Sequence, residues 1–171
     1  REHLAHDVRQ LIKAEKVTAI LVTHDQQEAF ATSDKIALLN DGKLMQWGSA
    51  SELYEKPNSV FSAEFIGQGA LITGAIKKDS NGVNNLHSEI GSLVISDNIA
   101  NTINNDSAKL LIRPDQISLS TTESGISVTL ISKSFRGGHY LCSLETSNKQ
   151  LLTALLPAQN IPNSGAQFFI T

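Results

Sequence analysis

Apolar positions near the start of the chain repeat with the period of an α-helix. Over Glu2–Glu15 they share one helix face, which is formed by Leu4, Val8, Leu11 and Ile12. A short run of mostly apolar and β-branched residues follows at Val17–Val22. A run of that length and composition predicts a strand that is buried on both faces of a parallel sheet.

Two residues three positions apart signal the start of a second helix. Asp25 and Glu28 resemble a capping box, in which each side chain accepts a hydrogen bond from the backbone amide of the other residue. We therefore expect a helix to begin there and to carry Ala29 and Phe30 inward.

A hairpin and two short helices are expected next. The hairpin turn is predicted at Asn40–Lys43, because the Asp-Gly pair within it tolerates positive φ. Serine caps and a proline bound the short helices. The expected elements are a second buried strand at Ile36–Leu39, a return strand at Leu44–Trp47, a helix from Ser49 or Ser51 through Tyr54 that ends before Pro57, and a helix at Val60–Ile66.

The composition and the apolar pattern of the sequence change after Gly67. Asn, Ser, Gly and Thr become frequent, and short alternating apolar segments recur at turn-sized intervals, which predicts a small all-β barrel or sandwich. A polar stretch at Asp97–Asp106 is typical of a loop. The expected strands are Leu71–Ile76, Leu93–Ile95, Leu110–Leu119, Ile126–Ile131, Tyr140–Leu144, Leu151–Leu156 and Phe168–Ile170. We place the boundary at Gly67–Gly69 and predict an α/β domain over residues 1–67, followed by an all-β domain over residues 68–171.

Charge and composition disfavour several classes of protein. The 171 residues are 40% apolar and 18% charged, which is not the composition of a charged disordered chain. A net charge of −3 and 5% aromatic residues disfavour DNA or RNA binding. No apolar run approaches the roughly 20 residues of a membrane helix. The chain starts at Arg1, inside a helical pattern, and we interpret it as part of a longer protein.

His24 is the first candidate for chemistry. It follows the first expected strand and lies one residue before the expected start of a helix. Ligands of open α/β sheets bind beyond the carboxyl ends of the strands, and a helix N-terminus there favours phosphate. An imidazole at this point can hydrogen-bond a terminal phosphate or orient an attacking water. The alternative is a histidine that is hydrogen-bonded to a neighbouring carbonyl group.

Several spaced motifs resemble ATPases of the ABC transporter family. The segment Thr23–Ala29 reads T-H-D-Q-Q-E-A and resembles the switch-histidine motif of the family, T/S-H-D-x-x-E-A. Asp34–Lys43 resembles the strand pair D-R-I-x-V-L-x-x-G-x, and Gln46–Pro57 resembles Q-x-G-x-P-x-E-L-Y-x-x-P. Phe61–Gly67 resembles the closing motif F-V-A-x-F-I-G. Their order over residues 23–67 makes the resemblance specific.

The second domain resembles the TOBE module, an OB-like barrel that is appended to many importer ATPases. Leu111–Leu119 is similar to its I-R-P-E-x-I-x-L strand, and Phe135–Tyr140 is similar to its F-x-G-x-x-Y turn. The two resemblances together cover nearly the whole chain. They imply the C-terminal part of a P-loop NTPase (ATPase) domain of α/β class, followed by an all-β TOBE barrel.

The resemblance implies the ATP-hydrolysing subunit of a bacterial binding-protein-dependent importer, peripheral at the cytoplasmic face of the inner membrane. His24 would contact the γ-phosphate and help to hold the attacking water. The implied cofactors are ATP and Mg²⁺. The implied partners are a second copy of the subunit, membrane permease subunits and, indirectly, a periplasmic or lipoprotein binding protein. The F-I-G-Q-G sequence at Phe65–Gly69 is most similar to ferric-iron importers, so iron(III) is the expected cargo.

The phosphate-binding motifs of that family do not occur in this sequence. Gly69 and Gly74 have the glycine spacing of G-x-x-x-x-G-K-[ST], but Ala75 stands where the lysine is required. Neither L-S-G-G-Q nor an apolar strand ending in Asp-Glu occurs. In the family these motifs precede the switch histidine. We therefore predict that this chain alone neither binds ATP tightly nor hydrolyses it.

An alternative function is a regulatory module that binds a small oxyanion, such as molybdate, or a sugar. Arg113, Arg136 and the amides of Gly137-Gly138 can form an anion site at the mouth of the barrel. The simpler interpretation of Arg113-Pro114 is the margin of a strand, where proline ends the ladder.

Two further features are interpreted as structural. His3, His6 and Asp7 lie near one helix face, but a solvated face is commoner than a metal site there, and we predict no metal. Cys142 is the single cysteine and alternates with apolar strand residues, which indicates a packed thiol.

Overall fold

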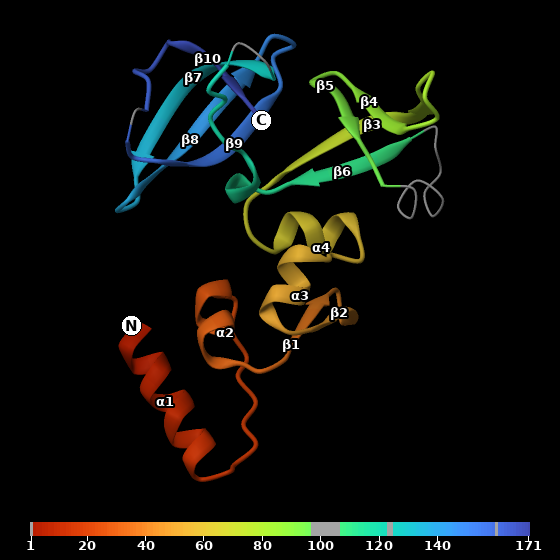
Figure 1. Ribbon diagram of the computed structural model, residues 1–171. Coiled ribbons are helices and arrows are strands. Elements are labelled where there is room, and N and C mark those ends of the chain that lie inside the picture. Colours follow the sequence, from red (N-terminus) through yellow and green to blue (C-terminus); the bar gives the residue numbers. More distant parts are fainter. Residues whose placement is uncertain (1, 97–106, 123–124, 160) are drawn as a thin grey trace. The chain divides into compact units, whose positions relative to one another are not determined.

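The computed structural model describes residues 2–96, 107–122, 125–159 and 161–171 (Figure 1). Its contacts divide the chain into two compact units, Arg1–Gly67 and Gln68–Thr171, which we call the N-terminal unit and the β-rich unit. The expected loop at Asp97–Asp106 lies outside the described residues.

The first helix forms as predicted, but the strand after it does not. Helix α1 spans Glu2–Ala14. The segment over residues 17–22, which we call the unpaired segment, belongs to no strand and exposes its apolar side chains to solvent. Ile20 is 90% exposed and Val22 is 92% exposed. The prediction of a buried strand was wrong for this structure, because a strand needs neighbours and no described residue pairs with this segment.

Helix α2 (Gln26–Thr32) begins where the sequence predicts. The Asp25 carboxylate accepts hydrogen bonds from the amides of Gln27 at 2.9 Å and Glu28 at 3.2 Å. The reciprocal half of the capping box is replaced, because the Glu28 carboxylate accepts a hydrogen bond from the Thr23 hydroxyl at 2.6 Å instead. Ala29 and Phe30 are both half-buried, and Phe30 packs against the small core of the unit.

Strands β1 (Ile36–Asn40) and β2 (Lys43–Gly48) form an antiparallel hairpin. Its turn has φ of 47° at Asp41 and 74° at Gly42, the two positive values that the Asp-Gly sequence predicts. The expected burial on both faces was wrong: Leu38 is buried, but its neighbour Leu39 is 62% exposed. One face of the hairpin therefore packs inward and the other faces solvent.

Two short capped helices complete the N-terminal unit. Helix α3 (Ala50–Glu55) starts with a full capping box between Ser49 and Glu52. Helix α4 (Val60–Phe65) is capped by the Ser59 hydroxyl, which accepts a hydrogen bond from the Ser62 amide. The buried apolar cluster of this unit is small and consists of Leu38, Leu53 and Ile66.

The β-rich unit contains two four-stranded antiparallel sheets among the described residues. The first sheet has the order β5 (Gly91–Val94), β4 (Asn84–Ser88), β3 (Ala70–Lys78) and β6 (Ala108–Ile112). The second has the order β10 (Gln167–Ile170), β7 (Ile126–Phe135), β8 (His139–Thr146) and β9 (Leu151–Pro157). The expectation of short antiparallel strands is confirmed. The second sheet curls like half of a barrel (Figure 1).

Two details of the strand prediction were wrong. The expected single strand Leu110–Leu119 ends at Ile112 and continues as a 3₁₀ turn over Pro114–Gln116, because proline has no amide for the ladder. Leu119 then forms an isolated bridge with Ile170. Strand β4 was not predicted, because its sequence Asn-Asn-Leu-His-Ser is mostly polar.

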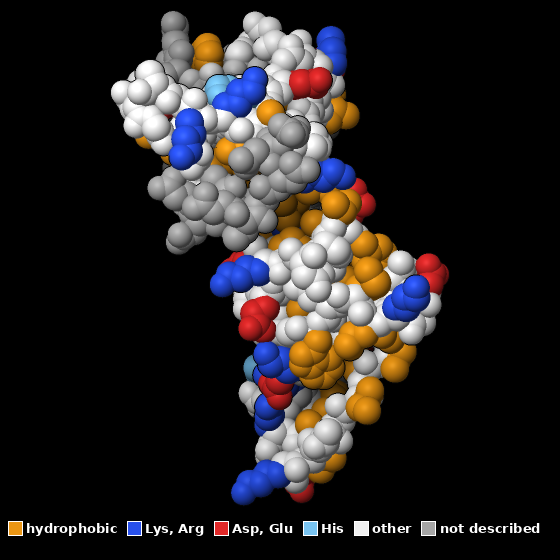
Figure 2. All heavy atoms as spheres, turned by 90° about the vertical axis from the view of Figure 1, so that its right-hand side faces the viewer, with side chains coloured by type: hydrophobic (Ala, Val, Ile, Leu, Met, Phe, Trp, Pro, Cys, Tyr) orange, Lys and Arg blue, Asp and Glu red, His pale blue; other side chains and the backbone are white. Residues whose placement is uncertain are grey.

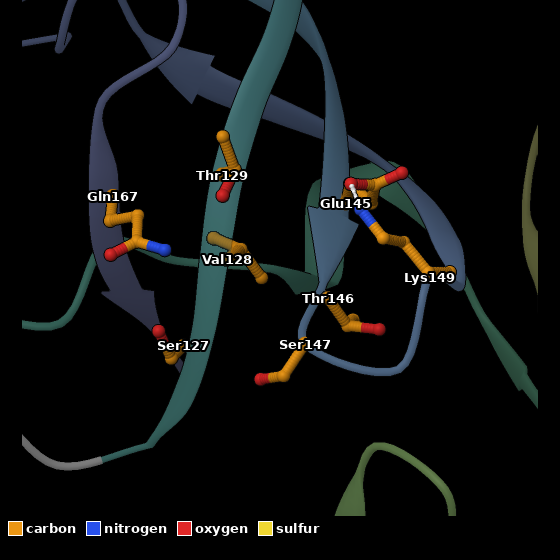
Figure 3. A pocket seen from close by; sticks show the side chains of 8 residues that line it. All are labelled: Ser127, Val128, Thr129, Glu145, Thr146, Ser147, Lys149 and Gln167. Carbon is orange, nitrogen blue, oxygen red and sulfur yellow. Dashed lines mark hydrogen bonds and ion pairs between the residues drawn. The ribbon is translucent and has the colours of Figure 1, made fainter.

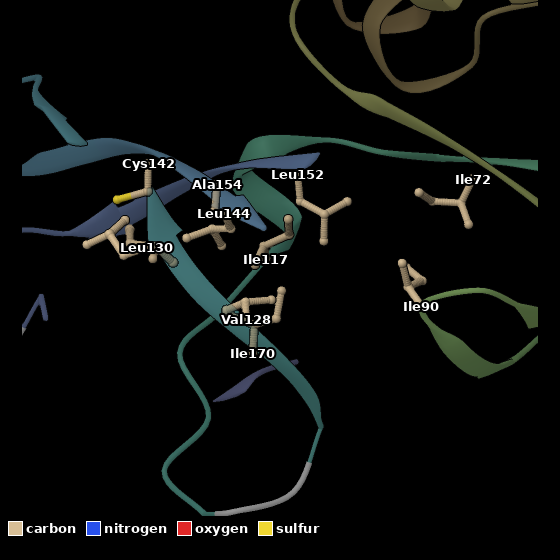
Figure 4. Close-up of a cluster of buried hydrophobic side chains, with 11 residues drawn as sticks. Ile72, Ile90, Ile117, Val128, Leu130, Cys142, Leu144, Leu152, Ala154 and Ile170 are labelled. Atoms are coloured by element: carbon tan, nitrogen blue, oxygen red, sulfur yellow. The ribbon is translucent and has the colours of Figure 1, made fainter. Parts of the chain in front are cut away.

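The core of the β-rich unit lies against the inner face of the second sheet (Figure 4). Every second residue of β9, and of β8 from Cys142 onward, is buried, which is the period of a strand with one face inward. Cys142 and Leu144 are fully buried there, so the thiol is packed as predicted. Ile72 from the first sheet joins the same cluster.

Candidate functional site

The structure places His24 in the exposed loop between the unpaired segment and helix α2. It immediately precedes Asp25, the N-cap of that helix. The imidazole makes no hydrogen bond or ion pair with a described residue, so the alternative of a histidine tied to a neighbouring carbonyl group does not apply in this structure. The side chain is therefore available to a ligand.

The N-terminus of helix α2 offers less to a phosphate than the sequence suggests. The Asp25 carboxylate already accepts from two amides of its first turn. A carboxylate at that point also carries negative charge, which opposes an approaching anion. Two of the amides at this helix end are thus already engaged, and the His24 imidazole is the side chain that we expect to contact a phosphate in this loop.

Helix α1 is tied to the segment between α2 and β1 by ion pairs. Arg9 donates from Nη1 to the Thr32 carbonyl at 2.6 Å and from Nη2 to the Asp34 carboxylate at 2.5 Å. Lys13 pairs with the other oxygen of the same carboxylate. These contacts lower the pKa of Asp34, the Lys13 hydrogen bond most. The His24 loop thus lies between two helices that are held together at the far end of α2.

Gln26, the first residue of helix α2, makes contacts that the sequence analysis missed. Its amide nitrogen donates to the Phe65 carbonyl, and its amide oxygen accepts from the Gly67 amide at 3.0 Å. The partners lie 39 and 41 residues downstream. No periodicity or capping pattern reports a contact of that sequence separation, so the sequence carried no signal for it.

The two arginines of the candidate anion site have different environments. Arg113 is only 2% exposed, and its guanidinium donates to the Gln68 carbonyl at 3.2 Å. Arg136 is exposed in the turn between β7 and β8, and its side chain has no hydrogen bond or ion pair with a described residue. Its backbone amide donates to the His139 carbonyl and so closes the turn. The structure therefore does not present the two charges to one solvent-facing point.

The hollows on the β-rich unit are shallow, and the first has a polar lining. One of about 180 Å³ lies over β7 and β8 (Figure 3). Glu145 and Lys149 form an ion pair of 2.8 Å at its rim, so their charges offset each other. A second hollow of about 250 Å³ is lined by Gln68, Lys133 and serine hydroxyls. Lys133 already donates to the Pro162 carbonyl at 2.9 Å. Neither hollow offers an unengaged lysine charge.

The N-terminal unit carries many exposed apolar side chains, which gather in the lower part of Figure 2. They come from the unpaired segment, from the outer face of the β1–β2 hairpin and from helices α1 and α4. On that face the register pairs Leu39 with Leu44, and both are exposed, as is Trp47. Contiguous exposed apolar surface of this kind marks an interaction surface.

The described residues contain neither a metal-binding cluster nor a membrane-spanning helix. Within the described ranges, no group of three or more His, Cys, Asp or Glu side chains is placed to hold a metal ion. His6 lies 2.8 Å from the Gln10 amide nitrogen, while the side chain of His3 is outside the described part of the chain. None of the described helices has both the length and the apolar character that a membrane crossing requires.

Comparisons with known proteins agree with the sequence motifs. Residues 110–171 match the family model of the TOBE domain. The chain is 33% identical over 164 residues to the Fe(3+) ions import ATP-binding protein FbpC of Pasteurella multocida. The matched region covers 95% of this chain and 45% of that protein. It is 29% identical over 153 residues to the spermidine/putrescine import ATP-binding protein PotA of Mesoplasma florum. That match covers 88% of this chain and 42% of that protein. The chain thus spans less than half the length of these curated relatives. It carries a TOBE domain over residues 110–171 and is distantly homologous, over most of its length, to the ATP-binding proteins of ABC importers.

Proposed function

We propose that this chain is the C-terminal part of the ATP-hydrolysing subunit of an ABC importer and that His24 is its switch histidine. The observation that carries the proposal is the similarity to two import ATP-binding proteins, which extends over most of the chain and through both units. The free, exposed imidazole in the T-H-D segment supports the assignment of His24.

The exposed apolar surface of the N-terminal unit supports the same proposal. A β-branched segment that exposes Ile20 and Val22 is poorly suited to water, because burying one such side chain contributes about 1.5–3 kcal/mol. In a complete ATPase domain, strands from the preceding polypeptide would pair with residues 17–22 and cover them. The exposed face of the β1–β2 hairpin would be covered in the same way.

His24 would act by hydrogen-bonding the γ-phosphate of ATP and by orienting the water for in-line attack. Bound ATP would draw the His24 loop toward the phosphate, whereas ADP offers no γ-phosphate to contact. The difference in contact free energy would drive the transporter between its states. The described residues do not form a site for Mg²⁺, so we assign binding of the ion, and of most of the triphosphate, to the preceding part of the subunit.

The same proposal sets the partners and the location. A second copy of the subunit and membrane permease subunits would assemble with it at the cytoplasmic face of the inner membrane, and a periplasmic or lipoprotein binding protein would deliver the cargo. We propose iron(III) as that cargo, supported by the F-I-G-Q-G sequence at Phe65–Gly69 and by the Fe(3+) import relative. Because a spermidine/putrescine relative is nearly as similar, uptake of ⁵⁵Fe³⁺ and of labelled spermidine should be compared in cells that lack the gene.

Turnover of ATP by the complete subunit tests the role of His24. We expect His24→Ala to lower turnover at least about 100-fold while ATP binding persists, because the histidine acts on the transition state rather than on the bulk of the nucleotide. His87→Ala is the matched control, since His87 is also exposed but lies on β4. Turnover by the 171-residue chain alone, above that of its own His24→Ala variant, would overturn the proposal that the residues binding Mg²⁺ and most of the triphosphate lie outside this chain.

A further inference from the structure

A single side chain fixes the end of the N-terminal unit. The Gln26 amide bridges the two backbone groups that flank Ile66, donating to the Phe65 carbonyl and accepting from the Gly67 amide at 3.0 Å. Ile66 itself is 2% exposed and belongs to the apolar cluster of the unit. Gly67 has φ of 70°, a left-handed conformation that ends helix α4. The last residues of the unit are thus held by packing and by Gln26 together.

The next residue is held by the β-rich unit. Arg113 donates from Nη1 to the Gln68 carbonyl at 3.2 Å, and its own backbone amide donates to the Gln116 side chain at 2.8 Å. Gly69 lies against the same place: a Cβ on it would come within 2.9 Å of Leu111 and 3.2 Å of the Arg113 guanidinium. The chain at Gln68–Gly69 is therefore closely packed on the end of β6 and cannot accept a larger residue at Gly69 without displacing its neighbours.

We propose that Gln26 is a positioning residue that links the His24 loop to the start of the β-rich unit. Gln26 lies two residues after His24 and directly after the N-cap Asp25, so a displacement of the loop displaces its amide. From there the connection runs through the Gly67 amide to the Gln68 carbonyl, which Arg113 holds. The two contacts are on consecutive residues, Gly67 and Gln68, so no intervening residue can absorb the displacement.

The proposal rests on the proposed function, because it takes γ-phosphate binding at His24 as the event that moves the loop. It adds a route by which bound nucleotide would change the backbone at the start of the TOBE-containing unit. By linkage, a ligand or partner that fixes the β-rich unit would bias nucleotide affinity by the same factor.

The contact itself can be tested in the 171-residue chain, without nucleotide. We expect Gln26→Ala to raise the amide exchange rate of Gly67 about fivefold. This is the change in the local opening equilibrium that corresponds to the usual net free energy of one hydrogen bond. Gln27→Ala is the matched control, because Gln27 is the same residue type at the next position and its side chain has no partner among the described residues. Far-UV circular dichroism should be unchanged in both, since Gln26 is only half-buried. Equal exchange of Gly67 in the two variants would overturn the proposal.

The link is tested in the complete subunit, by amide exchange with and without a non-hydrolysable ATP analogue. In the wild type we expect the analogue to slow exchange at residues 23–25 and to change it at residues 68–70. In Gln26→Ala the change at residues 68–70 should be lost while that at 23–25 remains, and Gln27→Ala should behave as the wild type. If the change at residues 68–70 is absent in the wild type or persists in Gln26→Ala, the link is refuted. If residues 23–25 do not respond in any variant, the proposed role of His24 is refuted instead.

Discussion

Replacing Ile20 with alanine tests whether the unpaired segment is an internal strand of a complete ATPase domain. In the 171-residue chain Ile20 is 90% exposed, so truncating its side chain removes almost no buried contact. Substitutions at such positions change the free energy of unfolding by no more than about 0.5 kcal/mol. If strands from the preceding polypeptide enclose the segment, the same substitution deletes buried methyl groups and costs about 2–5 kcal/mol. The effect of one mutation therefore differs by several-fold between the two proteins.

Urea unfolding followed by tryptophan fluorescence measures both effects. Trp47 is the single tryptophan of this chain and lies in the N-terminal unit. With a denaturant dependence of about 2 kcal/mol per molar urea, the expected loss lowers the midpoint of the complete subunit by about 1 M or more and leaves that of the chain nearly unchanged. Leu53→Ala is the control, because Leu53 is fully buried and should cost about 2–5 kcal/mol in both proteins. A small effect of Ile20→Ala in both would refute the buried strand.

Three further predictions concern the rest of the chain. Gly74→Ala should destabilise the β-rich unit by about 1–3 kcal/mol in thermal unfolding, because a Cβ would lie 2.5 Å from the His87 carbonyl oxygen. The backbone hydrogen bond from Ser49, helped by a nearby lysine, lowers the pKa of Glu52 from 4.5 to about 2. The resulting stabilisation is present above pH 4.5 and is lost as the pH falls towards 2, so Glu52→Gln should flatten the acid unfolding curve in that window, which tryptophan fluorescence follows. Burial raises the pKa of the Cys142 thiol, so a thiol reagent should label the folded chain far more slowly than the urea-unfolded chain, and equal rates would contradict the packing.

The elements that depend on nearby residues could be predicted from the sequence. Asp25 and Ser49 cap their helices because each side chain reaches amides only two or three residues away. The turn at Asp41-Gly42 forms because both residues tolerate positive φ. These preferences act within one turn of chain and need no distant partner.

Elements whose state depends on distant partners were predicted less well. The run Val17–Val22 has the composition of a buried strand, yet strand formation requires hydrogen bonds from a neighbour, and the described residues supply none. Strand β4 shows the converse, because its polar sequence pairs with both β3 and β5 and is held by the sheet rather than by its own propensity.

The residues of the candidate site also differ in whether the local sequence predicts them. His24 could be singled out from a short motif, because a strand end next to a helix start is a local property of the sequence. Gln26 could not, since Gln27 is the same amino acid one position later. Successive residues of an α-helix project about 100° apart, so only one of the two can face Phe65 and Gly67. Which one does so is decided by how helix α2 packs in the N-terminal unit, so the difference in function that we propose between two identical side chains originates in tertiary structure.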